Sequence, residues 1–449
     1  MIKEENTART RFSITSFIRE EAIGGLLLLV AAVIALVWAN SGAYGLYDRI
    51  WHDLKLGLSF GDFEMKYSLR HWINDGLMAV FFFMVGLEIK REVIAGELST
   101  IRKASLPIAA AAGGMLFPAL IYAALNFRDP AHLAGWGTPM ATDIAFALGI
   151  LSLLGKRVNI NLKIFLTALA IADDLGAILV IALFYTDSIN IAQLINAGIF
   201  LVILFGANRL GVRRTAFYAI VGFLGVWMAF MFSGIHATIA GVLIALTIPV
   251  RTKVTEKEYV EELCTLVNKF EAEKPNDNPM LTQRQSHLVS KISKLTDDAN
   301  TPLQKLEHAL HPITAYFILP LFALANAGVR IEGNISDMLF HPVSLGIMAG
   351  LIAGKFIGIA LFSRIMVKLK LAVLPEGVTW KQIYGIGLLA GIGFTMSIFI
   401  SGLAFGSEDL EHIAKVGIFS ASFIAGIAGF LLLRFMGGKT TTDKKLEEK

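Results

Sequence analysis

The sequence has almost no cysteine and little charge for its length. Among 449 residues there is one cysteine, Cys264, and Asp, Glu, Lys and Arg together make up 17%. A single cysteine cannot form an intramolecular disulfide, and no cysteine–histidine spacing matches a metal site. The scarcity of charge, beside 55% apolar residues and a mean hydropathy of +0.63, excludes a soluble globular protein of this length. The composition predicts a polytopic membrane protein.

The excess of positive charge is also small. The formal net charge is +4, and the basic residues are spread over loops, so nothing in the pattern indicates a nucleic-acid partner. Residues 1–21 are polar with acidic residues among them, unlike the basic region and cleavage site of a secretory signal. We therefore expect the first apolar run to be retained as a membrane helix.

Apolar stretches long enough to span a bilayer, which takes about 20 residues, recur along the whole chain. We predict twelve spans: 22–39, 71–89, 104–125, 134–155, 162–185, 190–207, 214–232, 233–250, 309–329, 341–367, 380–406 and 412–436. An even number places both termini on one side. Because Lys and Arg concentrate in the alternate loops that begin with the N-terminal tail, the positive-inside rule predicts that both termini are cytoplasmic.

The outer segment 40–70 carries a β-hairpin pattern. Residues 54–60 and 63–69 flank Gly61-Asp62, a dipeptide typical of a tight turn. An isolated hairpin is only marginally stable, so we expect this one to pair further, with its own copy in a homodimer as the candidate. A loop containing a chance Gly-Asp pair is the alternative.

The cytoplasmic segment 251–307 has apolar residues at helical spacing on both sides of a break at 275–279. This pattern predicts a helical hairpin, and a solvated linker is the alternative. Together with this insertion, the chain divides into a cytoplasmic tail at 1–21, a transmembrane domain at 22–436 and a second cytoplasmic tail at 437–449. The predicted fold class is therefore an all-α polytopic membrane protein with a small outer hairpin.

Three carboxylates lie in sequence that is otherwise apolar enough for a bilayer: Asp143, Asp173 and Asp174. A charged side chain at the centre of a membrane costs roughly 2.5–3.5 kcal/mol on insertion scales, so such a residue usually has a function. These residues are the candidate ion or proton site.

The fourth and eleventh predicted spans both contain helix-interrupting residues. Pro139 lies in the fourth span, and four glycines lie between positions 385 and 393 in the eleventh. Proline removes a backbone donor and clashes with the preceding turn, so we expect a break in each helix. Paired interruptions in two halves of a chain point to a transporter site, whereas each one alone is equally explained by a packing kink.

Asp173 and Asp174 are adjacent, so on a helix they point about 100° apart and are expected to differ in role. One faces a cavity and binds a cation, and the other pairs with a base. The candidate base is Lys355, which lies well inside a predicted span. A carboxylate partner stabilises a buried ammonium, and such a pair is a natural proton carrier, with a fixed salt bridge as the alternative.

Carboxylate and hydroxyl oxygens suit hard cations such as sodium rather than soft metals. Two acids that share one small site do not easily both stay ionised without a cation, so sodium and protons are expected to compete for them. That competition is the minimal mechanism of an antiporter.

Charged residues also gather where two spans end on the cytoplasmic side. Glu88 and Glu92 close the second span with basic residues between them, and Glu307 opens the ninth beside two histidines. Helix capping, or the charge that sets the orientation of a span in the membrane, explains each residue alone. Together these charged residues could gate access to the site according to pH. His236 carries an imidazole, the side-chain type that can act as a pH switch, but a lone histidine in a membrane is more often a hydrogen bonder between helices. Asp75 is as readily explained as a boundary residue.

Several motifs resemble the NhaA family of bacterial sodium/proton antiporters. They lie in family order between about residues 15 and 436: Gly86-Leu87-Glu88-Ile89-Lys90-Arg91-Glu92, Ala141-Thr142-Asp143-Ile144-Ala145-Phe146-Ala147-Leu148-Gly149, Asp173-Asp174-Leu175-Gly176-Ala177-Ile178, His236-Ala237-Thr238-Ile239-Ala240-Gly241, Leu306-Glu307-His308, Leu324-Ala325-Asn326-Ala327-Gly328 and Gly391-Ile392-Gly393-Phe394-Thr395-Met396-Ser397. The segment 251–305 is longer than we expect of that family.

The resemblance implies a twelve-helix fold of the bacterial inner membrane, with an inverted repeat and with the fourth and eleventh helices unwound and crossing at mid-membrane. It implies roles for the site residues. Asp174 is the principal sodium and proton carboxylate, Asp173 its partner, and Lys355 the lysine that interacts with Asp173. Asp143 and Thr142 lie at the crossing, where Asp143 and Lys355 offset the helix dipoles.

The resemblance further implies electrogenic export of sodium or lithium, driven by inward proton flow through alternating access, in the service of sodium and pH homeostasis and salt tolerance. Glu88, Glu92, Glu307 and His236 match positions linked to the pH response. The family implies a homodimer joined through the hairpin at 54–69, and neither a cofactor nor an enzymatic activity.

Other classes of protein also place carboxylates in membranes. Intramembrane aspartyl proteases typically carry Gly-x-Gly-Asp on one helix and Tyr-Asp on another. The predicted spans of this chain contain neither motif. The sequence also lacks His-Glu-x-x-His, so it does not support a zinc protease. A sodium-coupled symporter that binds an organic solute is the nearest rival, and a passive channel is another.

Overall fold

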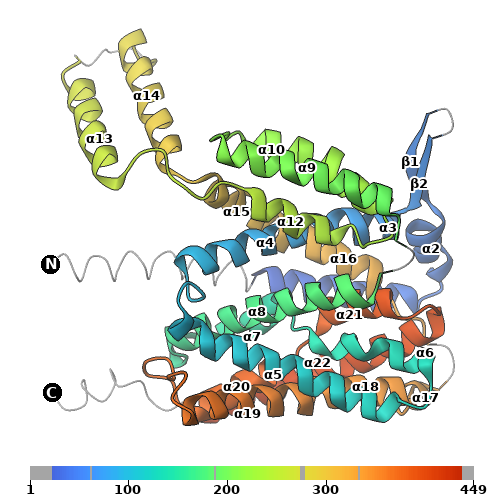
Figure 1. Ribbon diagram of the computed structural model, residues 1–449. Helices are drawn as coiled ribbons and strands as arrows, with labels where there is room; N and C mark the ends of the chain where they lie inside the picture. Colours follow the sequence, from blue (N-terminus) through green and yellow to red (C-terminus); the bar gives the residue numbers. More distant parts are fainter. Residues whose placement is uncertain (1–22, 61–62, 187–188, 274–278, 332–333, 437–449) are drawn as a thin grey trace, which may run out of the picture.

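The computed structural model describes residues 23–60, 63–186, 189–273, 279–331 and 334–436. It is almost entirely helical, with one small sheet, and in Figure 1 the helices lie in two layers with roughly parallel axes. The predicted turn at Gly61-Asp62, the break at 275–279 and the two tails lie partly or wholly outside the described residues.

The first layer, which we call the upper bundle, packs around α4. Its helices are α4 (Met78–Ala95), α9 (Ile191–Arg209), α10 (Thr215–Val221), α11 (Met228–Met231), α12 (Thr238–Thr247), α15 (Pro302–Ile313) and α16 (Leu319–Asn326). The short helices α2 (Tyr44–Asp48) and α3 (Leu69–His71) lie at one end of this bundle, and α3 continues through the helical residues Trp72–Leu77 into α4.

The second layer, the lower bundle, packs around α5 and α22. Its helices are α5 (Ile101–Asn126), α6 (Pro130–Leu133), α7 (Ile144–Leu153), α8 (Ile160–Phe184), α17 (Ile335–Leu339), α18 (Pro342–Ala349), α19 (Lys355–Lys368), α20 (Trp380–Leu389), α21 (Phe394–Ala404) and α22 (Glu408–Met436). A further apolar helix, Ile23–Ala39, touches both bundles, because Gly24 lies against Ala315 and Gly25 against Ala145.

Close backbone approach explains the tight pairing of α4 with α12 and of α5 with α19. A Cβ atom added at Gly241 would lie 2.2 Å from the carbonyl oxygen of Ala79, and one added at Gly358 would lie 2.0 Å from that of Gly113. Lipid is as apolar as leucine, so helices in membranes associate through such close packing of small residues rather than through hydrophobic burial.

Six of the described helices are long and apolar enough to cross a membrane: Ile101–Asn126, Ile160–Phe184, Ile191–Arg209, Pro302–Asn326, Pro342–Lys368 and Glu408–Phe435. The pair Trp380–Leu389 and Phe394–Ala404, bent by 46°, would make a seventh. Four further apolar helices are shorter. The chain is thus a polytopic, mainly α-helical membrane protein, as its composition predicted, and the number of twelve spans stays a prediction.

One predicted span is much shorter as a helix than the sequence suggested. The segment 233–250 contains α12, which has only 10 residues. Ser233 ends the preceding helix, since its hydroxyl donates to the carbonyl of Phe230 and accepts from the backbone N–H of Ile235. Such local side-chain bonds compete with helical ones, and hydropathy alone does not register them.

Two features mark opposite ends of the molecule in Figure 1. At one, which we call the hairpin end, β1 (Lys55–Phe60) and β2 (Phe63–Ser68) pair antiparallel with Lys55 opposite Ser68 and Phe60 opposite Phe63, so the predicted hairpin is present. At the other, the loop end, α13 (Glu256–Glu271) and α14 (Gln283–Ala299) pack on each other and project from the bundles.

Candidate functional site

Two short non-helical segments are hydrogen-bonded to each other inside the lower bundle. Residues 141–143 separate the 3₁₀ turn Ala134–Met140 from α7, and residues 390–393 separate α20 from α21. The segment 141–143 supplies the donors, and carbonyl groups of the segment 390–393 accept them. The Thr142 hydroxyl donates to the carbonyl of Ala390 at 2.8 Å, and the backbone N–H of Asp143 donates to that of Ile392 at 2.7 Å. Backbone groups freed from a helix must find partners within the protein wherever water is excluded, and the Asp143 N–H and the Ile392 carbonyl satisfy each other in this way.

Asp143 places its carboxylate at the start of two helices. It accepts hydrogen bonds from the backbone N–H of Phe146 in the first turn of α7, and from both the backbone N–H and the hydroxyl of Thr395 in the first turn of α21. A negative charge is favoured at a helix N-terminus, where backbone N–H groups have no helical partner. Asp143 therefore stabilises the starts of α7 and α21.

Asp173 on α8 forms a buried ion pair with Lys355, the first residue of α19. The Lys355 Nζ donates to the Asp173 Oδ2 at 2.5 Å, and both side chains are buried. Two charges removed from water persist only when each neutralises the other. The pair also joins α8 to α19, whose approach to α5 the glycines at 113 and 358 permit.

Asp174, the next residue on α8, points away from that pair into a cavity between the two bundles. The cavity has a volume of about 50 Å³, enough for a few water molecules. Its lining combines Asp174, Asp143, Thr142, Thr167 and Thr395 from the lower bundle with Glu88, His311 and Thr314 from the upper bundle, among apolar residues.

The acids of this site keep hydrogen-bonding capacity that the protein does not use. Among the described residues, neither Asp174 Oδ2 nor Asp173 Oδ1 has a hydrogen-bond partner, and both oxygens are buried. A buried carboxylate oxygen without a donor is costly unless a proton or a cation satisfies it. Oxygen donors of this kind suit a hard cation such as sodium.

Three glutamates and an arginine cluster beside the cavity on its loop-end side, and we call this cluster the glutamate mouth. Arg91 on α4 forms an ion pair with Glu307 on α15 and a 3.1 Å contact with Glu92. Glu92 also accepts a hydrogen bond from the backbone N–H of Glu97, and Glu88 lines the cavity itself. The structure therefore brings Glu88, Glu92 and Glu307 together, as the sequence grouping suggested.

His236 lies apart from this mouth. It precedes the hairpin-end start of α12, and Asp75 is among its electrostatic neighbours. The other end of α12 is the one near the mouth, since Lys90 donates to the carbonyls of Leu246 and Ile248 there. The helix α12 therefore separates His236 from the three glutamates.

Thr395 and Thr314 were not singled out as site residues from the sequence. Thr395 holds the Asp143 carboxylate through two hydrogen bonds, and Thr314 faces the cavity with a buried hydroxyl that has no partner among the described residues. The sequence could have indicated Thr395, because it lies in the first turn of α21, shortly after Gly391 and Gly393. Nothing in the local sequence distinguishes Thr314.

Comparison with known proteins gives consistent results over nearly the whole chain. The model of a family described as Na+/H+ antiporter 1 matches residues 15–433. A Na(+)/H(+) antiporter NhaA of Oleidesulfovibrio alaskensis is 53% identical over 423 residues, covering 94% of this chain and 93% of the relative. Proteins of the same name from Sulfurimonas denitrificans and Helicobacter pylori are each 48% identical, and each alignment covers 94% of this chain, with 94% and 95% of the relatives.

Proposed function

This chain belongs to the Na+/H+ antiporter 1 family, and on that premise we propose that it exports sodium ions in exchange for protons at Asp174. The family is one of transporters, and sodium and protons are its transported substrates rather than cofactors. One observation carries the assignment of the site. The Asp174 carboxylate is buried, lines the cavity between the bundles, and keeps one oxygen without a hydrogen-bond partner among the described residues.

In the proposed mechanism, one site alternately holds a sodium or lithium ion or protons. Asp174 is the principal ligand, Asp173 contributes when Lys355 releases it, and Thr142 and Asp143 shape the crossing beside them. Two observations support this division of roles: the Asp173 Oδ1 has no hydrogen-bond partner among the described residues, and the Asp173 Oδ2 accepts from Lys355. Because two carboxylates offer two proton positions for one monovalent cation, exchange would be electrogenic.

We further propose that access from the cytoplasm depends on pH through Glu88, Glu92 and Glu307, with His236 as a separate candidate. The ion pair and contacts of Arg91 at the cavity mouth support the first three. Regulation of this kind would let the protein serve sodium and pH homeostasis and salt tolerance.

The proposed membrane arrangement has twelve spans in an inverted repeat, with both termini in the cytoplasm of a bacterial inner membrane. The crossing of residues 141–143 and 390–393 would then lie at mid-membrane as two interrupted spans. The loop end, with α13 and α14, would face the cytoplasm, and the hairpin end the outer side. We propose a homodimer joined through residues 54–69.

The test is sodium-dependent proton movement in proteoliposomes under an imposed pH gradient. Sodium should collapse the gradient with the wild-type protein and not with Asp174→Asn. Asp409→Asn is the matched control, because Asp409 is an exposed acid at the start of α22 and should retain exchange. A wild-type protein that binds sodium but moves no protons at any pH would instead support a sodium–solute symporter.

A further inference from the structure

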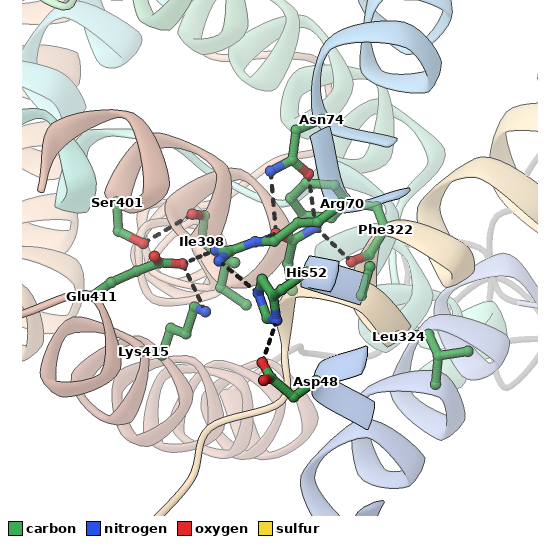
Figure 2. Close-up of polar contacts among 12 residues, drawn as sticks. Asp48, His52, Arg70, Asn74, Phe322, Leu324, Ile398, Ser401, Glu411 and Lys415 are labelled. Atoms are coloured by element: carbon green, nitrogen blue, oxygen red, sulfur yellow. Dashed lines mark hydrogen bonds and ion pairs between the residues drawn. The ribbon is translucent and has the colours of Figure 1, made fainter. Parts of the chain in front are cut away.

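A polar cluster at the hairpin end joins the upper and lower bundles (Figure 2). Its centre is Arg70 on α3, which forms an ion pair with Glu411 on α22. The same guanidinium lies 3.0 Å from the Asn326 Oδ1 and 3.2 Å from the His52 Nε2. Arg70 therefore holds partners from both bundles with one side chain.

Each end of this connection is anchored in its own bundle. On the upper side, the Asn74 and Asn326 amides exchange hydrogen bonds, which fixes the C-terminal end of α16 against the residues that follow α3. On the lower side, Glu411 also contacts the Lys415 Nζ at 2.7 Å, one turn further along α22. Asp48 and His52 complete the cluster through a 2.8 Å contact.

The cluster lies on the side of the cavity opposite the glutamate mouth. The cavity residues of α4 run from Phe81 to Glu88, toward the loop end, whereas α4 starts near Arg70 at the hairpin end. Between the cavity and the cluster, Phe399 of α21 packs against Phe82 and Phe322 of the upper bundle, with ring centroids 5.5 and 6.1 Å apart. An aromatic contact and then an ion pair therefore close the space between the bundles at the hairpin end.

An exchanger must expose its site to each side in turn, so these two bundles must separate at the hairpin end at one stage of the cycle. We propose that Arg70 and Glu411 form a latch that holds the hairpin end closed while the site faces the glutamate mouth. The latch rests on the proposed function, because only alternating access requires it to open. Arg70 acts on the population of the two states and does not touch the transported ion.

The two partners of Glu411 suit a latch that opens and closes. When Arg70 withdraws, the Glu411 carboxylate keeps its contact with Lys415, so opening does not leave a buried charge unpaired. For the same reason Arg70→Met should fold, since Met fills part of the space of the arginine stem and leaves Glu411 paired.

The first test measures access at the hairpin end. In a Cys264→Ser background, Ser401→Cys places a reporter on the buried hairpin-end half of α21, near Glu411 in Figure 2. A membrane-impermeant thiol reagent added to intact cells should label this reporter about fivefold faster or more with Arg70→Met than without it. Arg128→Met is the matched control, because this exposed arginine lies over Phe127 in the lower bundle alone, and its labelling rate should stay unchanged.

The second test closes the hairpin end covalently. Cysteines replace Arg70 and Glu411 in the Cys264→Ser background, with Lys415→Met added so that no ammonium loses its partner. A reducible bifunctional thiol reagent should stop sodium–proton exchange, and reduction should restore it. Exchange by the Cys264→Ser background tests the proposed function separately.

Two results would each overturn the latch. One is labelling of the Arg70→Met reporter at the unsubstituted rate. The other is exchange that continues at full rate after cross-linking. If Arg70→Met fails to fold, the cross-linked protein still decides the question. If the background itself moves no protons, the proposed function is wrong rather than the latch.

Discussion

Lys355 and Asp173, 182 residues apart in the sequence, form an ion pair that is completely enclosed by protein, with 0% and 1% of their side chains exposed. Neither residue would be tolerated alone at this depth, because an unpaired buried charge is far more costly than a paired one. The pair places Asp173 toward α19 and leaves Asp174 to face the cavity.

Replacing one member of this pair should destabilise the protein more than replacing both. We expect Asp173→Asn or Lys355→Met alone to cost about 3–5 kcal/mol, since each leaves a buried charge without its partner. The double substitution should recover most of that loss. Thermal unfolding of the four proteins in detergent measures the difference, and equal, additive losses would contradict the coupling.

The Asp143 carboxylate should matter chiefly as an acceptor at two helix starts. Asp143→Ala removes the bonds to Phe146 and Thr395 and should cost about 1–2 kcal/mol for each cap that is lost. Asp143→Asn keeps an acceptor oxygen and should cost less. Thr395→Val, which removes one donor only, is the control and should be the mildest. An order with Asn worse than Ala in thermal unfolding would refute the capping role.

The glutamates at the loop-end mouth should set the pH profile of exchange. Glu307→Gln removes the charge that pairs with Arg91, so we expect the midpoint of the profile to move by more than about half a pH unit. Glu97→Gln, an acid of the same region that pairs with Lys103, should leave it in place. His236→Gln, at the separate candidate, should move the midpoint less than Glu307→Gln, because α12 separates His236 from the mouth. Rates measured in proteoliposomes from about one pH unit below neutrality to about two units above it check all three.

Helix α13 should lose its N-terminal stability in acid. Hydrogen bonds from the Thr255 backbone N–H and hydroxyl hold the pKa of Glu258 below its ordinary value. A carboxyl whose pKa is lowered by folding contributes stability above its ordinary pKa, and that stability is lost as the pH falls through the lowered value. Hydrogen exchange of the first-turn amides, corrected for intrinsic rates, should show this loss in the wild type and not in Glu258→Gln. Glu262→Gln, on the same helix but outside the cap, should behave like the wild type.

The hairpin should join two copies of the chain without taking part in exchange. Replacing residues 55–68 by a short Gly-Ser linker should shift the protein from dimer to monomer in detergent, as measured by native mass spectrometry. Exchange in proteoliposomes should persist, because the cavity and its acids lie in the helical bundles. A dimer that survives the deletion would place the interface elsewhere.

The sequence by itself determined the class of protein and the chemistry of its site. A chain with 55% apolar residues and 17% charged residues is a membrane protein on composition alone, and carboxylates within apolar stretches predict an ion or proton site because charge is costly there. The helical period showed that Asp173 and Asp174 must face different neighbours. The period alone did not say which of them meets Lys355, and only the family resemblance pointed to Asp173.

Only the tertiary structure shows physically why those neighbours are chosen. The choice of Asp173 for Lys355 depends on how α8 packs beside α19, and the cavity at Asp174 depends on where the two bundles fail to touch. Nothing in the sequence indicated the latch at Arg70, because Arg70 and Glu411 are 341 residues apart and neither belongs to a local motif. Contacts between distant segments arise from packing geometry, which local composition and periodicity do not encode.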